Sequence, residues 1–349
     1  MGIVFAILLF SFLIFIHELG HFIAAKLSGV QVNEFSIFMG PAIFKKQVGE
    51  TLYAIRCIPI GGYCAMEGED EKTDNPRSFR RAKWWKRLII LVAGSFMNFV
   101  VGVLLVAIVL FWQPAYVTPQ ISAVEQWSTV SDLQVGDTIL EINGEKIHVY
   151  EDFSLATMML PNGSYDIVVE RDGQRILLED VLMERQAVQD ENGAVNYLYG
   201  LSFTPVDTTP GSVPGRILPT AFNHVKTVIM SLKMLVTGQV SAGDVSGPVG
   251  IVAIMSDVAE QSAPGYAVMN LLSIGAFIAI NLAVMNMLPI PALDGGRVLG
   301  LILTTIIEKI TRKEVNAKVE GYIHAVGMIL LLALMAVILF KDVFMLFRG

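Results

Sequence analysis

Charged residues are scarce in this 349-residue chain, at 16% of the sequence against 54% hydrophobic residues. So large an apolar excess excludes an ordinary soluble enzyme and indicates a membrane protein. There is no long basic run and the net charge is −7, which argues against a nucleic-acid partner. The two cysteines, Cys57 and Cys64, are too few for a disulfide framework, and their spacing fits no zinc knuckle.

Basic residues are also absent from the N-terminal region, where no Lys or Arg precedes Lys26. A cleaved signal peptide carries a basic n-region and a small-residue cleavage site, and this apolar run has neither. We therefore expect residues 1–27 to remain as a first membrane-spanning helix.

Four stretches are apolar and long enough to provide the roughly 20 residues with which a helix crosses a bilayer. Two loops are basic, with ten Lys and Arg in 28–87 and five in 297–321, whereas residues 113–265 carry seven against nineteen acidic residues. The positive-inside rule then predicts a multi-pass protein of the cell membrane with both basic loops cytoplasmic and both termini outside. The four predicted spans are residues 1–27, 88–112, 266–296 and 322–349.

One polar motif interrupts the first apolar stretch. His17-Glu18-Leu19-Gly20-His21 has the form H-E-x-x-H, and residues four apart share a face of a helix. Both imidazoles can therefore reach one zinc ion, with Glu18 placed to take a proton from the attacking water. The alternative is a polar patch used in helix packing, which the cost of ionisable groups inside a membrane disfavours.

A catalytic zinc ion needs a third protein ligand and an open position. The next histidine, His148, falls in the acidic external region and is therefore on the wrong side. Asp294 lies at the predicted cytoplasmic end of the third stretch, the same depth at which His17 and His21 lie in the first. Asp-Gly-Gly after a helix is commonly only a turn, but a carboxylate at membrane depth needs a partner, which favours a ligand.

Together these motifs resemble the site-2 protease family, and its RseP-like bacterial branch in particular. H-E-L-G-H in a first membrane helix is followed late in the chain by Asn286-Met-Leu-Pro-Ile-Pro-Ala-Leu-Asp294-Gly-Gly. The resemblance implies an intramembrane zinc metalloprotease in which His17, His21 and Asp294 bind Zn2+ and Glu18 is catalytic. It also implies that Asn286 helps hold substrate near the metal, although an interhelical hydrogen bond explains this residue equally well.

Residues 55–66 are similar to the membrane-associated β-loop of that family. The resemblance implies that this loop, with Gly61 and Gly62, binds the substrate as an added β-strand. The alternative is a plain hairpin that turns at the two glycines. Residues 93–99 and 246–250 are similar to two further signatures of the family.

A β-rich extracytoplasmic domain is predicted for residues 115–185. Asn143-Gly144 is a hairpin signal, Asp172-Gly173 separates two strand candidates, and the sequence around residues 135–144 resembles a PDZ domain. This single PDZ-like domain would bind peptides or exclude bulky substrates, and a rigid spacer is the alternative. For residues 186–265 we predict a hairpin or linker followed by an amphipathic helix. This helix would lie on the membrane surface or clamp the entry to the active site, and ordinary packing against the PDZ-like domain is the alternative.

The predicted fold class is therefore a membrane α-helical protein with four transmembrane helices and an inserted extracytoplasmic PDZ-like domain. The family resemblance implies substrates that are single-span membrane proteins already trimmed outside, such as anti-sigma factors, and signal-peptide remnants, cut within membrane lipid near the cytoplasmic face. Two other classes stay open. A metal-ion transporter predicts ligands along a path through the membrane, and a PDZ scaffold with an inactive protease core predicts a lost ligand or a lost Glu18.

Overall fold

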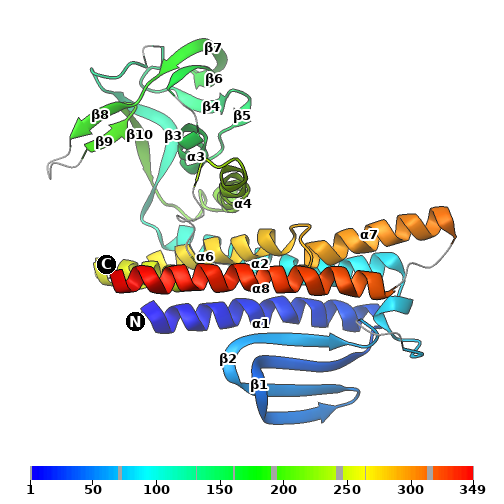
Figure 1. Ribbon diagram of the computed structural model, residues 1–349. Helices are drawn as coiled ribbons and strands as arrows, with labels where there is room; N and C mark the ends of the chain where they lie inside the picture. The colour runs from blue at the N-terminus through cyan, green and yellow to red at the C-terminus, as the bar shows by residue number, and fades with distance from the viewer. Residues whose placement is uncertain are drawn as a thin grey trace. The chain divides into compact units, whose positions relative to one another are not determined.

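The computed structural model describes residues 2–69, 73–130, 132–159, 162–189, 195–240, 247–263, 265–312 and 317–348. The chain divides into two compact units. Unit 1 combines Met1–Leu105 with Val228–Gly349 and is mainly helical, and unit 2 is Val106–Thr227, built around a β-sheet (Figure 1).

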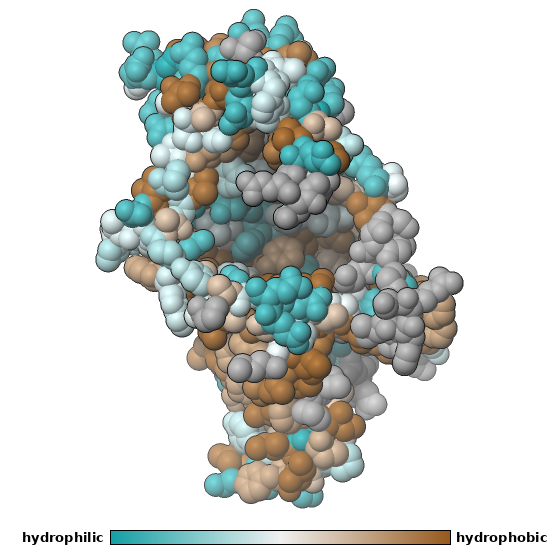
Figure 2. Space-filling view, turned by 90° about the vertical axis from the view of Figure 1, so that its left-hand side faces the viewer, coloured by the Kyte–Doolittle hydropathy of each residue, from teal (hydrophilic) through white to brown (hydrophobic). Residues whose placement is uncertain are grey.

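Within the residues that the structure describes, four helices are long and apolar enough to cross a membrane, in agreement with the number predicted from the sequence. A helix satisfies its own backbone hydrogen bonds, as a segment in lipid requires. Hydrophobic side chains predominate on the helical unit, whereas hydrophilic ones are common on unit 2 (Figure 2). The four helices are α1 (Gly2–Ser28), α2 (Trp84–Trp112), α6 (Ala267–Asn286) and the Ala325–Asp342 part of α8 (Ala317–Arg348).

A further helix, α5 (Pro248–Gln261), packs with α1, α2 and α6. Its first turn is tied to α8, because the backbone N–H of Gly250 donates to Asp342 Oδ2 at 3.0 Å. The signature predicted at residues 246–250 therefore begins this helix, although Ser246 lies outside the described residues. The shared core contains Ala6, Leu9, Leu13, Val101, Met255, Leu271, Ile278 and Ala279.

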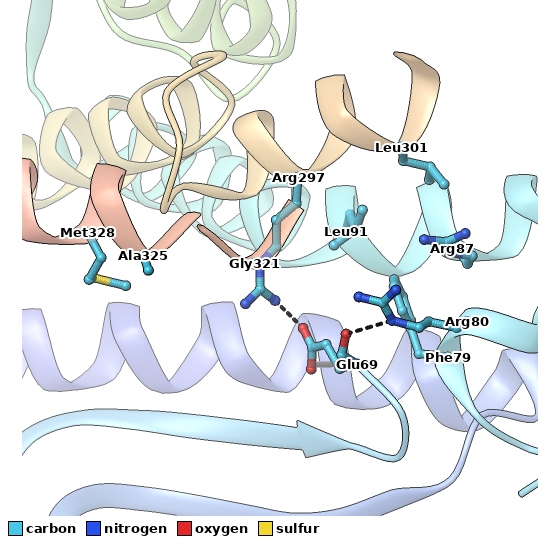
Figure 3. A pocket seen from close by; sticks show the side chains of 10 residues that line it. All are labelled: Glu69, Phe79, Arg80, Arg87, Leu91, Arg297, Leu301, Gly321, Ala325 and Met328. Atoms are coloured by element: carbon cyan, nitrogen blue, oxygen red, sulfur yellow. Dashed lines mark hydrogen bonds and ion pairs between the residues drawn. The ribbon is translucent and has the colours of Figure 1, made fainter. Parts of the chain in front are cut away.

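The segment predicted as a cytoplasmic loop, residues 297–321, is largely helical. Helix α7 (Asp294–Thr311) follows α6 after a turn that contains Pro289 and Pro291. Proline lacks the N–H that a continuing helix needs, so α6 ends at Asn286, ten residues before the end predicted for the third span at residue 296. Leu301 of α7 is buried in a core that also contains Leu91 of α2 (Figure 3).

The region between α1 and α2 forms a curled sheet from two long strands, β1 (Val32–Val48) and β2 (Thr51–Met66). Residues 34–37 of β1 pair with residues 52–55 of β2 on one side and with residues 62–65 on the other. Positive φ at Gly61 (80°) marks the change of direction, a conformation that glycine adopts without a steric cost. Residues 62–66 consequently lie at an edge of this sheet.

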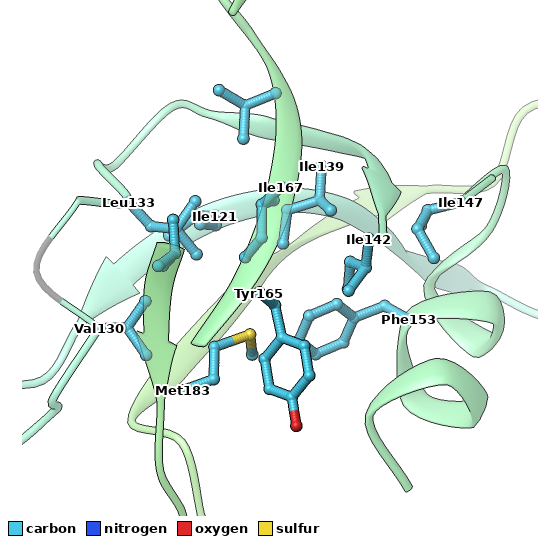
Figure 4. Close-up of a cluster of buried hydrophobic side chains, with 12 residues drawn as sticks. Ile121, Val130, Leu133, Ile139, Ile142, Ile147, Phe153, Tyr165, Ile167 and Met183 are labelled. Carbon is cyan, nitrogen blue, oxygen red and sulfur yellow. The ribbon is translucent and has the colours of Figure 1, made fainter. Parts of the chain in front are cut away.

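Unit 2 contains the predicted β-rich domain. Its sheet order is β10-β3-β4-β6-β7, with β5 paired to β4, and Asn143 and Gly144 form the β4–β5 turn with positive φ, as the hairpin signal predicts. Helix α3 (Tyr150–Met159) covers a core of isoleucines and valines with Phe153 and Tyr165 (Figure 4). The strands are β3 (Ala115–Val124), β4 (Thr138–Ile142), β5 (Glu145–Lys146), β6 (Gly163–Arg171), β7 (Gln174–Met183) and β10 (Leu201–Asp207).

The predicted end of this domain at residue 185 is too early. Strand β10 pairs with β3, from the pair Leu201 and Val124 to the pair Asp207 and Ala115. The last strand of the sheet therefore ends only at residue 207. In the sequence between β7 and β10, strands β8 (Gln186–Gln189) and β9 (Val195–Leu198) form a separate hairpin. Sequence reasoning missed β10 because its partner strand is far away in the chain. Helix α4 (Pro214–Val236) matches the amphipathic helix predicted in this region.

Candidate metal centre

Three side chains that the sequence predicts as metal ligands converge in unit 1. His17 and His21 lie one turn apart on α1, and Asp294 is the first residue of α7. The Nε2 atoms of the two histidines are 3.2 Å apart, and Asp294 Oδ2 lies 3.2 Å from His17 Nε2 and 3.3 Å from His21 Nε2. Segments almost 280 residues apart in the sequence thus place three donor atoms at the corners of a small triangle.

The loop before α7 explains how Asp294 reaches this position. Ala292 has a φ of 86°, which is strained for a residue with a side chain and turns the chain sharply. A Cβ on Gly295 would lie 2.2 Å from the carbonyl oxygen of Met287, and one on Gly296 would lie 2.2 Å from that of Ile290. The two glycines of Asp-Gly-Gly therefore allow the first turn of α7 to pack against the loop that precedes it.

The triangle fits a zinc ion. Ligand bonds of about 2.0–2.1 Å at tetrahedral angles put donor atoms about 3.3 Å apart, close to the three measured separations. Two imidazoles and a carboxylate form a donor set that zinc accepts, and three protein ligands leave a fourth position open. The side chains of His17, His21 and Asp294 are only 13%, 9% and 16% exposed, so few water molecules compete for these donors.

Neighbouring groups orient the two histidines. His21 Nδ1 lies 2.8 Å from the carbonyl oxygen of Ile90, so it carries the proton and leaves the Nε2 lone pair for a metal. His17 Nδ1 lies 3.4 Å from the side-chain amide of Asn286, the last residue of α6. Since an amide can present either its nitrogen or its oxygen at one position, Asn286 can accept the Nδ1 proton. Both interpretations of Asn286 stay open, because it contacts another helix and also lines the cavity described next.

A cavity of about 460 Å3 surrounds the three candidate ligands. Glu18 lines it, and the backbone of Cys64 hydrogen-bonds to the Glu18 carboxylate. Burial, and then the charge of Glu18, raise the pKa of the Cys64 thiol. The candidate base, the candidate ligands and part of β2 therefore line one cavity, with residues 63–66 of β2 along its wall.

The two predicted β-loop glycines lie at different places. A Cβ on Gly62 would be 3.6 Å from Glu18 Cγ, so the backbone of Gly62 passes directly beside the candidate base. A Cβ on Gly61 would instead meet the side chain of Met39, and neither glycine is among the described residues that line the cavity. Gly62 is therefore better placed than Gly61 to contact a substrate.

Sequence reasoning did not identify Gly94 of α2 as part of the site. A Cβ at this position would lie 2.4 Å from His21 Nε2 and 2.8 Å from His17 Cε1. Only the absence of a side chain lets α2 pass so close to the ligands. In the sequence, residues 93–99 are marked only by their similarity to a family signature.

We expect Gly94→Ala to lower zinc affinity by about tenfold or more, as changes beside metal ligands commonly do. The added methyl must displace imidazoles that Ile90 and Asn286 hold in place. Zinc content of the purified variant at limiting free zinc measures this effect. Gly215→Ala is the control, since a Cβ there meets nothing within 4 Å. Wild-type zinc binding by Gly94→Ala would show that the ligands do not need this close approach.

Comparisons with known sequences agree with this geometry. A model described as Peptidase family M50 matches residues 5–334. A "Putative zinc metalloprotease" of Clostridium perfringens is 36% identical over 350 residues, with 98% of both chains covered, and one of Clostridium acetobutylicum is 37% identical over 346 residues, with 98% and 97% covered. "Regulator of sigma-W protease RasP" of Bacillus subtilis is 28% identical over 425 residues, with 98% of both chains covered.

Proposed function

The chain belongs to peptidase family M50 and is a zinc metalloprotease, and we propose that it hydrolyses peptide bonds within the transmembrane segments of single-span membrane proteins. One observation supports this most strongly: His17, His21 and Asp294 present three donor atoms 3.2–3.3 Å apart in the cavity that Glu18 lines. Both histidines lie on α1, a helix of membrane-spanning character. The direct test is cleavage of a tagged single-span substrate by purified protein whose zinc content is measured in parallel. Wild-type protein that binds no zinc would contradict the proposal.

The roles of the residues follow from their positions. His17, His21 and Asp294 would hold the zinc ion, which when bound supplies a Lewis acid that polarises the scissile carbonyl and acidifies water. Glu18 accepts a proton from the water molecule that attacks the carbonyl carbon. The same carboxyl then returns this proton to the amide nitrogen as the C–N bond breaks, so the products are a carboxylate and an amine. Asn286, at the cavity wall, is proposed to hold the substrate backbone beside these groups.

A transmembrane helix hides its peptide bonds, so the substrate must unwind before hydrolysis. Residues 62–66 of β2 offer a place for the unwound segment, because they lie at a sheet edge and residues 63–66 line the catalytic cavity. Within the described residues, the ladder partners of this edge segment are in residues 32–37 of β1. A substrate strand added at the other side would bring its peptide bonds beside Glu18.

A cysteine placed on this edge is expected to form a disulfide with a substrate cysteine near the cut site. Ala65→Cys is a small change on the cavity wall, made together with Cys57→Ser, Cys64→Ala and Glu18→Gln to remove other thiols and turnover. Cross-linked complex is measured by non-reducing gel after mild oxidation. Lys46→Cys, on an exposed strand of the same sheet, is the matched control. Equal cross-linking at both positions would mean that residues 62–66 do not receive the substrate.

The substrate class is proposed from the family and from one relative. The name "Regulator of sigma-W protease" describes the Bacillus subtilis protein. By analogy we propose anti-sigma factors and signal-peptide remnants as substrates here, in the cell membrane, together with contact with lipid. The distribution of Lys and Arg supports an active site near the cytoplasmic face, with unit 2 and both termini outside.

Unit 2 is proposed to be a PDZ-like domain that faces the extracytoplasmic side. Strand β10 is an edge strand of its sheet. The ring centres of Phe203 on β10 and Phe153 on α3 are 4.7 Å apart, so this edge lies beside a helix. PDZ domains bind peptides by adding them as a strand to a sheet edge. The competing role is steric exclusion of substrates whose external part has not been removed.

Deletion of residues 115–207 distinguishes the two roles of unit 2. The deletion extends to residue 207 because β3 and β10 are hydrogen-bonded and must leave together. If the domain excludes bulky substrates, the deletion variant should cleave untrimmed single-span proteins that the intact enzyme leaves uncut. Cleavage of trimmed and untrimmed forms of one substrate, compared in the same membranes, measures the effect. Unchanged selectivity would rule out the exclusion role.

A further inference from the structure

A second cavity of about 350 Å3 in unit 1 is lined by arginines. Arg80, Arg87 and Arg297 contribute three guanidinium groups, Glu69 contributes one carboxylate, and the other side chains of the lining carry no charge (Figure 3). Guanidinium groups stay protonated in proteins. Among the described residues, the lining therefore has three positive charges and one negative charge, a net charge of +2.

The three arginines come from different elements, and two of them contact Glu69. Arg297 of α7 forms an ion pair with the Glu69 carboxylate, and Arg80, from the short 3-10 helix Phe79–Arg81, donates to the Glu69 backbone oxygen at 3.4 Å. Arg87 of α2 lies over the ring of Phe79, 5.1 Å from its centre. An anion in the cavity would be attracted by all three guanidinium groups.

Aromatic side chains indicate the depth of this cavity in the membrane. Trp84 and Trp85 at the start of α2 are 54% and 44% exposed, and Tyr322 near the start of α8 is 71% exposed. Exposed Trp and Tyr at the ends of membrane helices lie at the level of the lipid headgroups. The cavity is lined by Arg87, which follows the two tryptophans, and by Gly321, which precedes the tyrosine, so it lies at the same level.

We propose that this cavity binds the phosphate of an anionic phospholipid headgroup. Basic pockets between transmembrane helices on the cytoplasmic side are a known setting for such binding. Arginine is suited to it because its planar N–H fork matches phosphate oxygens in pairs. The ligand is a lipid rather than a soluble anion because the cavity lies among helices that begin at the membrane interface.

The same cavity connects the lipid to proteolysis. It shares Glu69 and Arg297 with the cavity that surrounds the metal centre, and Arg297 follows Asp294 by three residues on α7. A phosphate that competes with Glu69 for Arg297 alters the charge beside the catalytic cavity and at the end of β2. This coupling rests on the proposed function, whereas the binding itself does not.

The test measures lipid retention by the full chain, with the Glu18→Gln background used so that turnover plays no part. Native mass spectrometry counts phosphatidylglycerol molecules retained after exchange into detergent, with phosphatidylcholine as the uncharged comparison. Arg80→Gln with Arg87→Gln should lower the affinity for phosphatidylglycerol by about tenfold or more. Arg80→Lys with Arg87→Lys keeps both charges and should retain much of the binding. Arg81→Gln is the matched control, since Arg81 is exposed, pairs with Asp74 and does not line the cavity.

Each outcome decides the proposal. Specific loss in the double Gln variant, with binding kept in the Lys and Arg81 variants, supports the site. Equal retention in all variants, equal loss on Arg81→Gln, or equal binding of phosphatidylcholine overturns it. Displacement of the lipid by millimolar inorganic phosphate alone would identify a soluble anion as the ligand and also overturn the lipid assignment. Cleavage assays of the wild-type enzyme, which keeps Glu18, in vesicles with and without phosphatidylglycerol then test separately whether the lipid affects proteolysis.

Discussion

A Glu18→Gln protein is expected to keep its zinc and to cleave substrate at least about 100-fold more slowly than the wild type, the range typical of a lost general base. Glutamine has the size and shape of glutamate but cannot take up the proton of the attacking water. The three donor atoms of the metal centre come from other residues, so the site for the ion is unchanged. Cleavage of a tagged single-span substrate and zinc content are measured on the same preparations.

The control for this experiment is Glu260→Gln, an equivalent change at an exposed position on α5. It should alter neither zinc binding nor cleavage. Normal cleavage by Glu18→Gln would exclude Glu18 as the base and remove the main chemical argument for the mechanism. Loss of zinc from Glu18→Gln would instead show that the carboxylate helps to hold the ion.

The same pair of measurements separates the proposed enzyme from its two rivals. A metal-ion transporter gives no reason why one carboxylate should be needed for function but not for zinc binding, and it predicts ligands along a path, whereas the three donors here form one compact triangle. A scaffold with an inactive core predicts a missing ligand or base, but all three candidate ligands and Glu18 line one cavity.

Local pattern and membrane topology were enough to predict the centre of the site. His17 and His21 are fixed relative to each other by helical periodicity alone, so their spacing could be interpreted directly. Asp294 is 273 residues from His21, yet the predicted direction of each span put both at the cytoplasmic end. The position of a residue along a membrane-spanning helix determines its depth in the membrane. Equal depth was therefore enough to pair Asp294 with the two histidines without knowledge of the tertiary fold.

The parts that could not be predicted depend on contacts between distant elements. Gly94 matters because α2 passes within contact distance of the two histidines, and nothing in its own neighbourhood in the sequence reveals this. Strand β10 joins the sheet through β3, which lies some 80 residues earlier. Helix α7 was overlooked for another reason: its segment was interpreted from its basic residues, although Leu299, Ile302, Leu303 and Ile306 repeat with helical spacing.

An Asp294→Ala protein is expected to lose zinc and, with it, all measurable cleavage. Removal of one of three candidate protein ligands leaves two imidazoles. Loss of a residue that only hydrogen-bonds to a metal ligand typically lowers metal affinity by about 10- to 100-fold. Loss of a ligand itself should therefore lower the zinc affinity by more than about 100-fold. Dialysis against a series of buffered free zinc concentrations, followed by metal analysis, measures the affinity. Asp257→Asn, at an exposed position on α5, is the control for the loss of one acidic group.

Asp294→Asn makes the argument sharper, because the amide keeps the shape of the side chain but is a weaker ligand than a carboxylate. If Asp294 binds the ion, zinc affinity should fall in the order wild type, Asn, Ala, and cleavage should follow the same order at limiting zinc. High zinc should then restore part of the activity of the Asn variant and none of that of the Ala variant. If Asp294 is not a ligand, the Asn variant should bind zinc almost as the wild type does. That result would leave the centre with two histidines and require a different third ligand.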